Sequence, residues 1–334
     1  MDKKRALSIL EKFPEGHILV IGDLMLDEYI EGSIERISPE APIPVVNIFN
    51  QDADRRLGGA ANVFNNLISL GGRNICLCGI VGDDEKGAIL REKLRSMNGD
   101  TEGIIVEPHR PTTVKTRIVA HNQQVIRLDR EERAPISREI RQQVIAYILK
   151  KMNDVQALII SDYEKGLVTE HLLRDIIPRA VKKKICIAVD PKFSNFRHFK
   201  KVTIVVPNVK EAQAFVRHEV KTTGEVIDAA RAIIKALDCQ YVLIKMGERG
   251  MALVNSTGQY ITIETAAVEV YDVTGAGDTV ISTLMLARTA GATWEEAARL
   301  ANAAAGIAVS HLGTSPVGLE ELKKAIRTNR FPNL

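Results

Sequence analysis

The segment Asp272-Val-Thr-Gly-Ala-Gly-Asp278 combines the residue types that phosphate chemistry requires. Small residues at Gly275, Ala276 and Gly277 allow the backbone to approach an anion, and an apolar helical stretch follows them at once. The free N–H groups and the dipole at a helix start stabilise negative charge. Asp278 would stand in the first helical turn, where its carboxylate can accept a proton from a substrate hydroxyl. The segment predicts an anion hole at Gly275–Gly277 and a general base at Asp278.

The same residues have a purely structural interpretation, in which Asp278 complements the helix dipole and the glycines form a tight turn. We favour phosphoryl transfer, because two aspartates around Thr-Gly-Ala-Gly, between an expected strand at 267–270 and an expected helix at 275–290, are much more specific than a lone Gly-x-Gly. The sequence contains neither Gly-x-x-x-x-Gly-Lys-Ser/Thr nor Gly-x-Gly-x-x-Gly. A Rossmann dehydrogenase is therefore disfavoured.

A second polar segment, Pro207-Asn208-Val209-Lys210-Glu211, follows the apolar strand expected at 202–206 and opens a helix. Mg²⁺ keeps several waters and takes one or two protein carboxylates beside nucleotide phosphates, so Glu211 with Asn208 could position a hydrated Mg²⁺. Alternatively, Asn208 caps the helix and Glu211 completes a capping box. The presence of a second helix start suited to anions in the same expected sheet favours the nucleotide interpretation.

The other end of the expected pocket lies near the N-terminus. Asp23 ends the first expected strand, and Gly58, Gly59 and Asn62 begin the helix expected at 58–70. Because ligands of open α/β sheets gather at the carboxyl ends of strands, Asp23 and Asn62 could bind sugar hydroxyls, with the glycines allowing close backbone approach. A turn aspartate and an ordinary helical asparagine are nearly equal alternatives from these residues alone.

The elements that position these groups follow from hydrophobic periodicity. Buried strands of a parallel sheet are predicted at 17–22, 74–81, 155–160, 185–189, 202–206 and 241–245, and helices at 58–70, 84–97, 137–151, 169–181, 225–237, 275–290 and 293–310. This alternation predicts a doubly wound α/β fold with helices on both faces of the sheet. Half-exposed strands at 43–48, 112–119 and 123–128 predict a small antiparallel β-lid near 28–50 and 110–130, which could also form a homodimer. We treat 1–334 as one domain and 327–334 as a frayed tail.

Composition excludes several classes of protein. The 334 residues carry 45 basic and 42 acidic side chains, mixed along the sequence, so no nucleic-acid-binding arm or polybasic membrane anchor is expected. No signal peptide or membrane-spanning stretch is apparent, which favours a cytoplasmic protein. The 4 cysteines and 7 histidines show no disulfide or zinc spacing.

Taken together and in this order, Gly58-Gly59-Ala-Ala-Asn62, Asn208-x-x-Glu211 and Asp272-x-Thr-Gly-Ala-Gly-Asp278 resemble the ribokinase (PfkB) carbohydrate kinase family over most of the chain. More narrowly, the segments 36–42, 161–166 and 190–192 resemble the kinase domain that phosphorylates D-glycero-D-manno-heptose 7-phosphate at C1. The resemblance implies a ribokinase-like fold with a β-lid, ATP and Mg²⁺ as the phosphoryl donor system, a possible monovalent cation, and a role in making ADP-heptose for lipopolysaccharide.

The resemblance also implies roles for single residues. Asp278 matches the family's base, Gly275–Gly277 its anion hole, Asn208–Glu211 its nucleotide-phosphate motif, and Asp23, Gly58, Gly59 and Asn62 its sugar contacts. Lys245, Gly247, Gly250 and Asn302 are expected near the nucleotide. With Asp162, the basic residues Arg36, Lys115, Arg117, Arg127, Lys165 and Lys192 are candidates for binding a phosphosugar; Lys165 and Lys192 are favoured because each follows an apolar strand.

Two departures from the pattern matter. Asp278 is followed by Thr279-Val280, not by the small and aromatic pair of many family members, and the chain has no His-x-Gly-His nucleotidyl-transfer motif. Two rival functions stay open: a kinase of the same family acting on fructose 6-phosphate, ribose or a nucleoside, and a non-catalytic protein that senses sugars or nucleotides.

Overall fold

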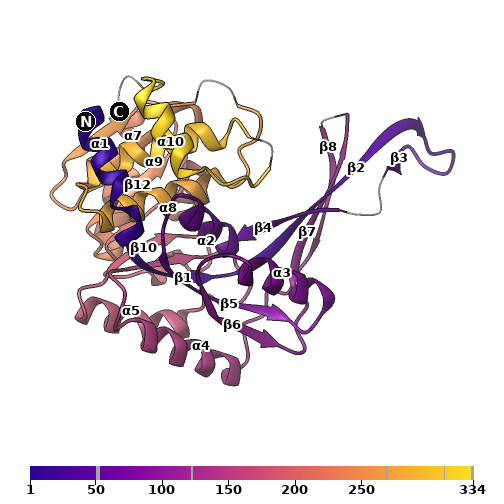
Figure 1. The fold of residues 1–334 in the computed structure, drawn as a ribbon, viewed down its shortest axis with the longest axis horizontal. Helices are drawn as coiled ribbons and strands as arrows, with labels where there is room; N and C mark the ends of the chain where they lie inside the picture. Colours follow the sequence, from indigo (N-terminus) through magenta and orange to yellow (C-terminus); the bar gives the residue numbers. More distant parts are fainter. Residues whose placement is uncertain (50–52, 122, 268–269, 312, 332–334) are drawn as a thin grey trace.

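The computed structural model describes residues 1–49, 53–121, 123–267, 270–311 and 313–331, which form two sheets, the larger surrounded by helices (Figure 1). The larger sheet has nine strands in the order β14 (Tyr260–Ile263), β13 (Met251–Asn255), β12 (Tyr241–Lys245), β11 (Ile204–Val205), β10 (Cys186–Asp190), β9 (Ala157–Ser161), β1 (His17–Gly22), β5 (Asn74–Gly82) and β6 (Asp100–Glu107). Neighbouring strands are parallel, except that β13 runs antiparallel to both β12 and β14. The predicted fold class is confirmed.

Each face of this sheet is covered by helices. In β1, Ile18 and Val20 belong to one apolar cluster, whereas Leu19 and Ile21 belong to another, because successive side chains of a strand point to opposite faces. The first cluster includes residues of α1 (Lys3–Glu11), α2 (Ala60–Ser69), α3 (Glu85–Arg95), α8 (Ala276–Thr289), α9 (Trp294–Ala308) and α10 (Leu319–Arg327). The second includes residues of α4 (Arg138–Lys151), α5 (Glu170–Lys182), α6 (Val209–Val216) and α7 (Thr223–Leu237). Full burial of each such Ile, Leu or Val side chain contributes roughly 1.5–3 kcal/mol to folding.

The second sheet projects to one side of the larger one (Figure 1). It consists of β2 (Leu24–Ile37), β3 (Pro44–Ile48), β4 (Asp54–Gly59), β7 (Thr113–Ala120) and β8 (Gln123–Arg130), and we call it the lid sheet. The long strand β2 pairs with β3 and β4 along one edge and with β7 along the other. The strands β3, β7 and β8 lie where the sequence predicts lid strands, whereas β4 lies outside the predicted ranges. The predicted antiparallel arrangement is wrong for one pair, because β2 and β7 run parallel. Two statements stay predictions: the lid sheet closes over a ligand, and the chain is one domain.

Two local expectations need correction. Gly58 and Gly59 are the last residues of β4, so α2 begins only at Ala60. A strand was expected at 267–270, but Ala267 and Val270 do not belong to a strand. Residues 268 and 269 lie outside the described residues. The neighbouring Ala266 backbone packs against Gly306 of α9, whereas the Val270 side chain is 61% exposed. Within the described ranges, every helix is too short or too polar for a membrane span.

Candidate active site

The predicted site residues meet because several strands end at the same edge of the sheet. Gly22 of β1, Ser161 of β9 and Asp190 of β10 lie in register, and Asn208 forms an isolated bridge with Lys245 at the end of β12. Ligands of open α/β sheets bind outside this edge. A cavity of about 830 Å³ lies there, which is within the ~300–1,000 Å³ range of small-molecule sites.

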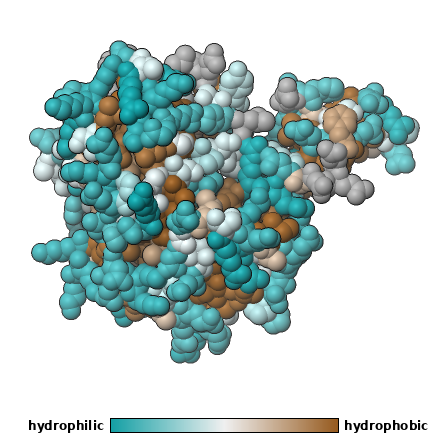
Figure 2. Space-filling view, in the orientation of Figure 1, coloured by the Kyte–Doolittle hydropathy of each residue, from teal (hydrophilic) through white to brown (hydrophobic). Residues whose placement is uncertain are grey.

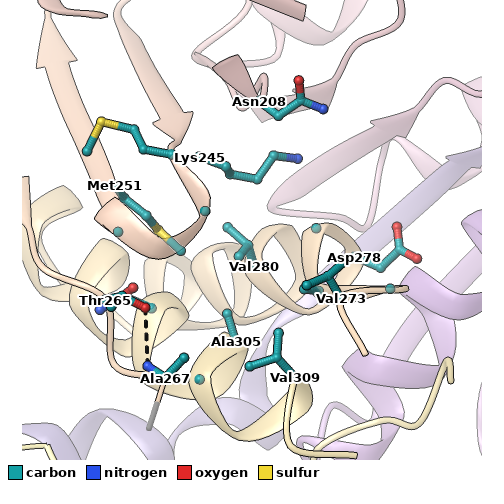
Figure 3. Close-up of a pocket in the computed structure, with 18 of the residues that line it drawn as sticks. Asn208, Lys245, Met251, Thr265, Ala267, Val273, Asp278, Val280, Ala305 and Val309 are labelled. Atoms are coloured by element: carbon teal, nitrogen blue, oxygen red, sulfur yellow. Dashed lines mark hydrogen bonds between the residues drawn. The ribbon is translucent and has the colours of Figure 1, made fainter. Parts of the chain in front are cut away.

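The cavity has a polar end and an apolar end (Figure 3). The Asn208, Lys245 and Asp278 side chains lie toward the polar end. The apolar end is lined by residues that include Met251, Val280, Ala305 and Val309. The predicted Gly247, Gly250 and Asn302 also line the cavity, and Asn302 Nδ2 donates to the Glu264 carbonyl (2.7 Å). An apolar slot beside cationic and amide groups suits a ligand with a flat ring at one end and phosphates at the other.

The Gly275–Gly277 loop is built for close approach of an anion. Gly275 has a φ of +82°, a left-handed conformation that side chains disfavour, and a Cβ there would lie 2.8 Å from Asn62 Nδ2. A Cβ on Gly277 would lie 3.1 Å from Lys245 Nζ. Ala276 N–H donates to the Val273 carbonyl (3.2 Å), whereas the N–H groups of Gly275 and Gly277 have no acceptor among the described residues. These two N–H groups at the start of α8 remain available for a phosphate oxygen.

Asp278 lies in the first turn of α8 and is only 3% exposed. Its Oδ2 accepts from Asn62 Nδ2 (2.7 Å), and its Oδ1 accepts from the Tyr163 hydroxyl (2.7 Å). Burial raises the pKa of the Asp278 carboxyl to about 6, although the bonds from Tyr163 and Asn62 oppose that rise. A carboxylate with this pKa is ionised at neutral pH and is a stronger base than an exposed aspartate.

Helix α2 is locked against α8 by polar contacts, and this fixes Asn62. Asn66 Nδ2 donates to the Asn62 carbonyl (2.9 Å), while the Thr279 hydroxyl donates to Asn66 Oδ1 (2.8 Å). The Ser282 hydroxyl donates to the Val63 carbonyl (3.0 Å). Asn62, predicted to contact sugar, therefore also orients the predicted base.

The Asn208–Glu211 segment forms the capping box that is the structural alternative for these residues. Glu211 N–H donates to Asn208 Oδ1 (2.9 Å), and Asn208 N–H donates to Glu211 Oε2 (2.8 Å). The Lys192 ammonium pairs with Glu211 Oε1. Of this segment Asn208 lines the cavity, whereas Val209, Lys210 and Glu211 do not. Each Glu211 oxygen already has a partner, which is compatible with the predicted metal contact through water, and that role stays a prediction.

Several predicted sugar ligands instead hold the loop that follows β9. Asp23 is 1% exposed, and its carboxylate accepts from the N–H groups of Tyr163 (2.8 Å), Lys165 (3.2 Å) and Leu167 (3.3 Å). Asp162 accepts from Glu164 N–H (2.9 Å) and from Asn195 Nδ2 (3.0 Å).

Burial raises the pKa of the Asp23 carboxyl, and burial beside Asp23 raises the pKa of Asp162 to about 7. Lys165 pairs with Glu131 (2.7 Å). The sugar contacts predicted for Asp23, Asp162 and Lys165 stay predictions.

The predicted residues of the lid sheet lie apart from one another. Gly58 lies at the base, where a Cβ would approach Asp27 Oδ2 to 2.6 Å, and Gly59 pairs with Leu24. Arg36 is exposed at the far end of β2, and Arg127 on β8 pairs with Asp129 (2.8 Å). The structure therefore does not bring these two arginines to the cavity.

Four further polar residues near the candidate site are Tyr163, Asp190, Asp27 and Lys115. The first three were not predicted as site residues, and Lys115 was predicted only as one of six basic candidates. Tyr163 lines the cavity and bonds to Asp278, and Asp190 lines it and accepts from Lys245 Nζ (2.7 Å). Asp27 pairs with Arg117 (2.5 Å) at the base of the lid sheet.

The Nζ atom of Lys115, on β7, lies 5.7 Å from the centre of the Tyr163 ring. Tyr163 and Asp190 could have been found from the sequence, because each lies at or just after the end of an expected strand. For the apolar lining residues no signal separates pocket from core.

Comparison with known proteins agrees with this geometry. The family model described as pfkB family carbohydrate kinase matches residues 17–321. The bifunctional protein HldE of Geotalea uraniireducens is 42% identical over 322 residues, covering 96% of this chain and 65% of that protein, and HldE of a Bradyrhizobium species is 40% identical over 316 residues, covering 94% and 64%. The chain thus spans about two thirds of the length of these relatives.

The fold is also that of solved structures. Phosphofructokinase-2 from Escherichia coli, in complex with substrates and products, superposes with a TM-score of 0.78 at 20% identity, covering 94% of this chain and 99% of that one. Arabidopsis thaliana ribokinase, complexed with ribose and ATP, gives 0.75 at 18% identity, covering 93% and 99%. The prediction of an ATP-dependent sugar kinase is confirmed at the level of the family. The chain belongs to the pfkB family of carbohydrate kinases.

Proposed function

We propose that this carbohydrate kinase transfers the γ-phosphate of ATP to the C1 hydroxyl of D-glycero-D-manno-heptose 7-phosphate, giving heptose 1,7-bisphosphate for ADP-heptose and lipopolysaccharide synthesis. The observation that carries the proposal is the placement of Asp278 at one end of a nucleotide-sized cavity. Its partner Tyr163 separates it from Lys115, whose ammonium has no ion pair within the described residues. The relatives named HldE and the motifs at 36–42, 161–166 and 190–192 support the choice of sugar.

In this proposal the adenine enters the apolar end of the cavity and the phosphates enter the polar end. The N–H groups of Gly275 and Gly277, with the Lys245 ammonium, balance charge that develops on the transferred group. Asp278 accepts the proton of the attacking hydroxyl. Asp190 directly and Glu211 through water would hold a Mg²⁺ ion, which neutralises phosphate charge when bound.

A substrate with its own phosphate needs a cation that is free to bind it, and Lys115 has this property. Lys165, Lys192 and Arg117 are each paired with a carboxylate. The Lys115 ammonium has no hydrogen-bond or ion-pair partner among the described residues, and burial lowers its pKa. Lys115 can therefore offer its full charge to a phosphate, whereas Lys165, Lys192 and Arg117 each share theirs with a carboxylate.

The Lys115 assignment predicts a specific kinetic change. Because a hydrogen bond to a charged group is worth roughly 1.5–3 kcal/mol, Lys115→Met should raise KM for the phosphosugar about 10–100-fold and leave KM for ATP nearly unchanged. Lys182→Met, which changes an exposed lysine on α5, is the control. An unchanged phosphosugar KM in the Lys115 variant would remove Lys115 from the site.

The substrate itself is tested by ADP release with heptose 7-phosphate, unphosphorylated heptose, fructose 6-phosphate, ribose and a nucleoside. We expect the highest kcat/KM with heptose 7-phosphate. A preference for an unphosphorylated sugar would overturn the phosphosugar proposal, and ligand binding without ADP release would favour a sensor. Potassium titration in the same assay tests the expected monovalent cation.

We also propose that two copies associate through their lid sheets. Exposed apolar side chains gather on β2, β3, β8 and the residue that follows β3, namely Ile37 (61% exposed), Ile48 (52%), Phe49 (67%), Ile126 (47%) and Leu128 (52%). Figure 2 shows hydrophobic residues on the projecting part of the molecule. Ile126 and Leu128 share one face of β8, and a second copy of the same face would remove both from water.

A further inference from the structure

Tyr163 connects three parts of the candidate active site. Its hydroxyl donates to Asp278 Oδ1 (2.7 Å), and its backbone N–H donates to the buried Asp23 carboxylate (2.8 Å). Its ring lies 5.7 Å from Lys115 Nζ of the lid sheet and 5.6 Å from Lys192 Nζ on the nucleotide side. A residue that contacts the base, the lid sheet and the nucleotide side at once can fix their relative placement.

We propose that Tyr163 is the positioning residue of the general base: its hydroxyl fixes the Asp278 carboxylate, while Asp23 holds Tyr163 in place. The proposal rests on the proposed function in one respect, that Asp278 is the base. It also explains the contacts of Asp23. The three hydrogen bonds that its carboxylate accepts within the described residues all come from the backbone of the loop carrying Tyr163.

The two partners of Asp278 differ in how they are held. Asn62 belongs to α2, which is locked against α8. Tyr163 belongs to the loop after β9, and its carboxylate anchor, Asp23, follows β1. Buried hydrogen bonds to a carboxylate favour its charged form, so each partner lowers the pKa that burial raises. The loop partner is the one that can be removed without disturbing the packing of helices.

The sign of the effect on the pH profile follows from these contacts. The ionisable groups that bear on Asp278 are Tyr163, Asp190, Lys192 and Lys245. Burial and the negative charge of Asp278 raise the pKa of Tyr163 well above its ordinary value, so this phenol stays protonated and acts as a donor at neutral pH. Loss of the Tyr163 hydroxyl should therefore raise the pKa of Asp278 and move the acidic limb of the kcat profile to higher pH.

The test compares Tyr163→Phe with Tyr260→Phe, which removes a hydroxyl from an exposed tyrosine on β14. Because loss of a hydrogen bond to a charged group shifts a pKa by about one to two units, the acidic limb in Tyr163→Phe should move up by about one to two pH units from its position near pH 6, and kcat at pH 7 should fall about 2- to 10-fold. KM for ATP should stay unchanged in Tyr163→Phe, and the acidic limb of the kcat profile should stay unchanged in Tyr260→Phe. A lower kcat with an unmoved limb would show a merely structural role and overturn the proposal.

A second variant covers the case in which Tyr163→Phe folds poorly. Replacement of Tyr163 by 3-fluorotyrosine keeps the ring and makes the phenol a stronger donor, so the limb should move to lower pH. Movement in the same direction as in Tyr163→Phe, or none, would contradict the proposal. Asp278→Asn measured beside these variants separates the two questions: normal turnover there would reject Asp278 as the base, whereas abolished turnover with an unmoved Tyr163→Phe limb would reject only the role of Tyr163.

Discussion

Replacing Asp278 by Asn should make the protein more stable and nearly inactive at the same time. The carboxylate is 3% exposed, and burial raises its pKa from the ordinary 3.8 to about 6. An amide keeps the shape of the side chain, because its oxygen can accept from Asn62 and its NH₂ can donate to the Tyr163 hydroxyl. The variant therefore removes a costly buried charge while Asn62 and Tyr163 each keep a hydrogen bond to residue 278.

The size and sign of the stability change follow from linkage. An unfolded chain releases this proton near pH 3.8 and the folded one near pH 6, so the contribution of Asp278 to stability is lost as pH rises through this window and stays lost above it. Each pKa unit corresponds to about 1.36 kcal/mol, so Asp278→Asn should gain about 3 kcal/mol at pH 8 and less than about 1 kcal/mol at pH 4. At the same time, loss of a positioned base should lower kcat about 10²–10⁴-fold.

Urea unfolding at pH 8 and pH 4, with kcat at pH 8, measures both effects. Asp228→Asn is the matched control, because the Asp228 side chain is 73% exposed on α7. It should change neither quantity. An equal gain at both pH values would refute the buried-charge reasoning, and near-normal turnover would refute Asp278 as the base.

Two further predictions concern the anion loop and the lid sheet. Gly275→Ala and Gly258→Ala both place a side chain at a positive φ, +82° and +87°, but only the first meets a neighbour, at 2.8 Å from Asn62 Nδ2. Both should lose about 1–2 kcal/mol in urea unfolding, and only Gly275→Ala should lose kcat, by about tenfold or more; equal kcat values would contradict the role of the loop. Leu128→Asp should convert a dimer into a monomer in sedimentation velocity, because it places a charge on the apolar face of β8, and a monomeric parent protein would contradict the proposed interface.

Most of the central sheet could be predicted from the sequence, because strands buried on both faces read as continuous apolar runs. The strand β1 and the helix α8 lie close to their expected bounds. The anion loop was also predictable, since Gly275 stands where a left-handed conformation is required. Edge strands such as β6 and β14 were not predicted, because their burial is only partial and their patterns resemble loops.

The partners of the site residues were harder to predict than the residues themselves. Asp23 was expected to face a sugar, but a sequence does not show that three backbone N–H groups of a loop 140 residues later use the same carboxylate. The sequence allowed Glu211 to be either a capping-box residue or a metal contact. The structure shows that the capping box uses its Oε2 and that Lys192 pairs with its Oε1. Tyr163 lay within a segment noted for its resemblance, yet its bond to Asp278 depends on tertiary contacts alone.

Phosphorus NMR of the product formed from ATP and heptose 7-phosphate tests the proposed reaction most directly. We expect one ADP for each sugar consumed and a second sugar phosphorus that couples to the anomeric proton, as a phosphate on C1 requires. A phosphate ester at another carbon would contradict phosphorylation of the anomeric hydroxyl. So would hydrolysis of ATP to ADP and inorganic phosphate without a new sugar phosphate.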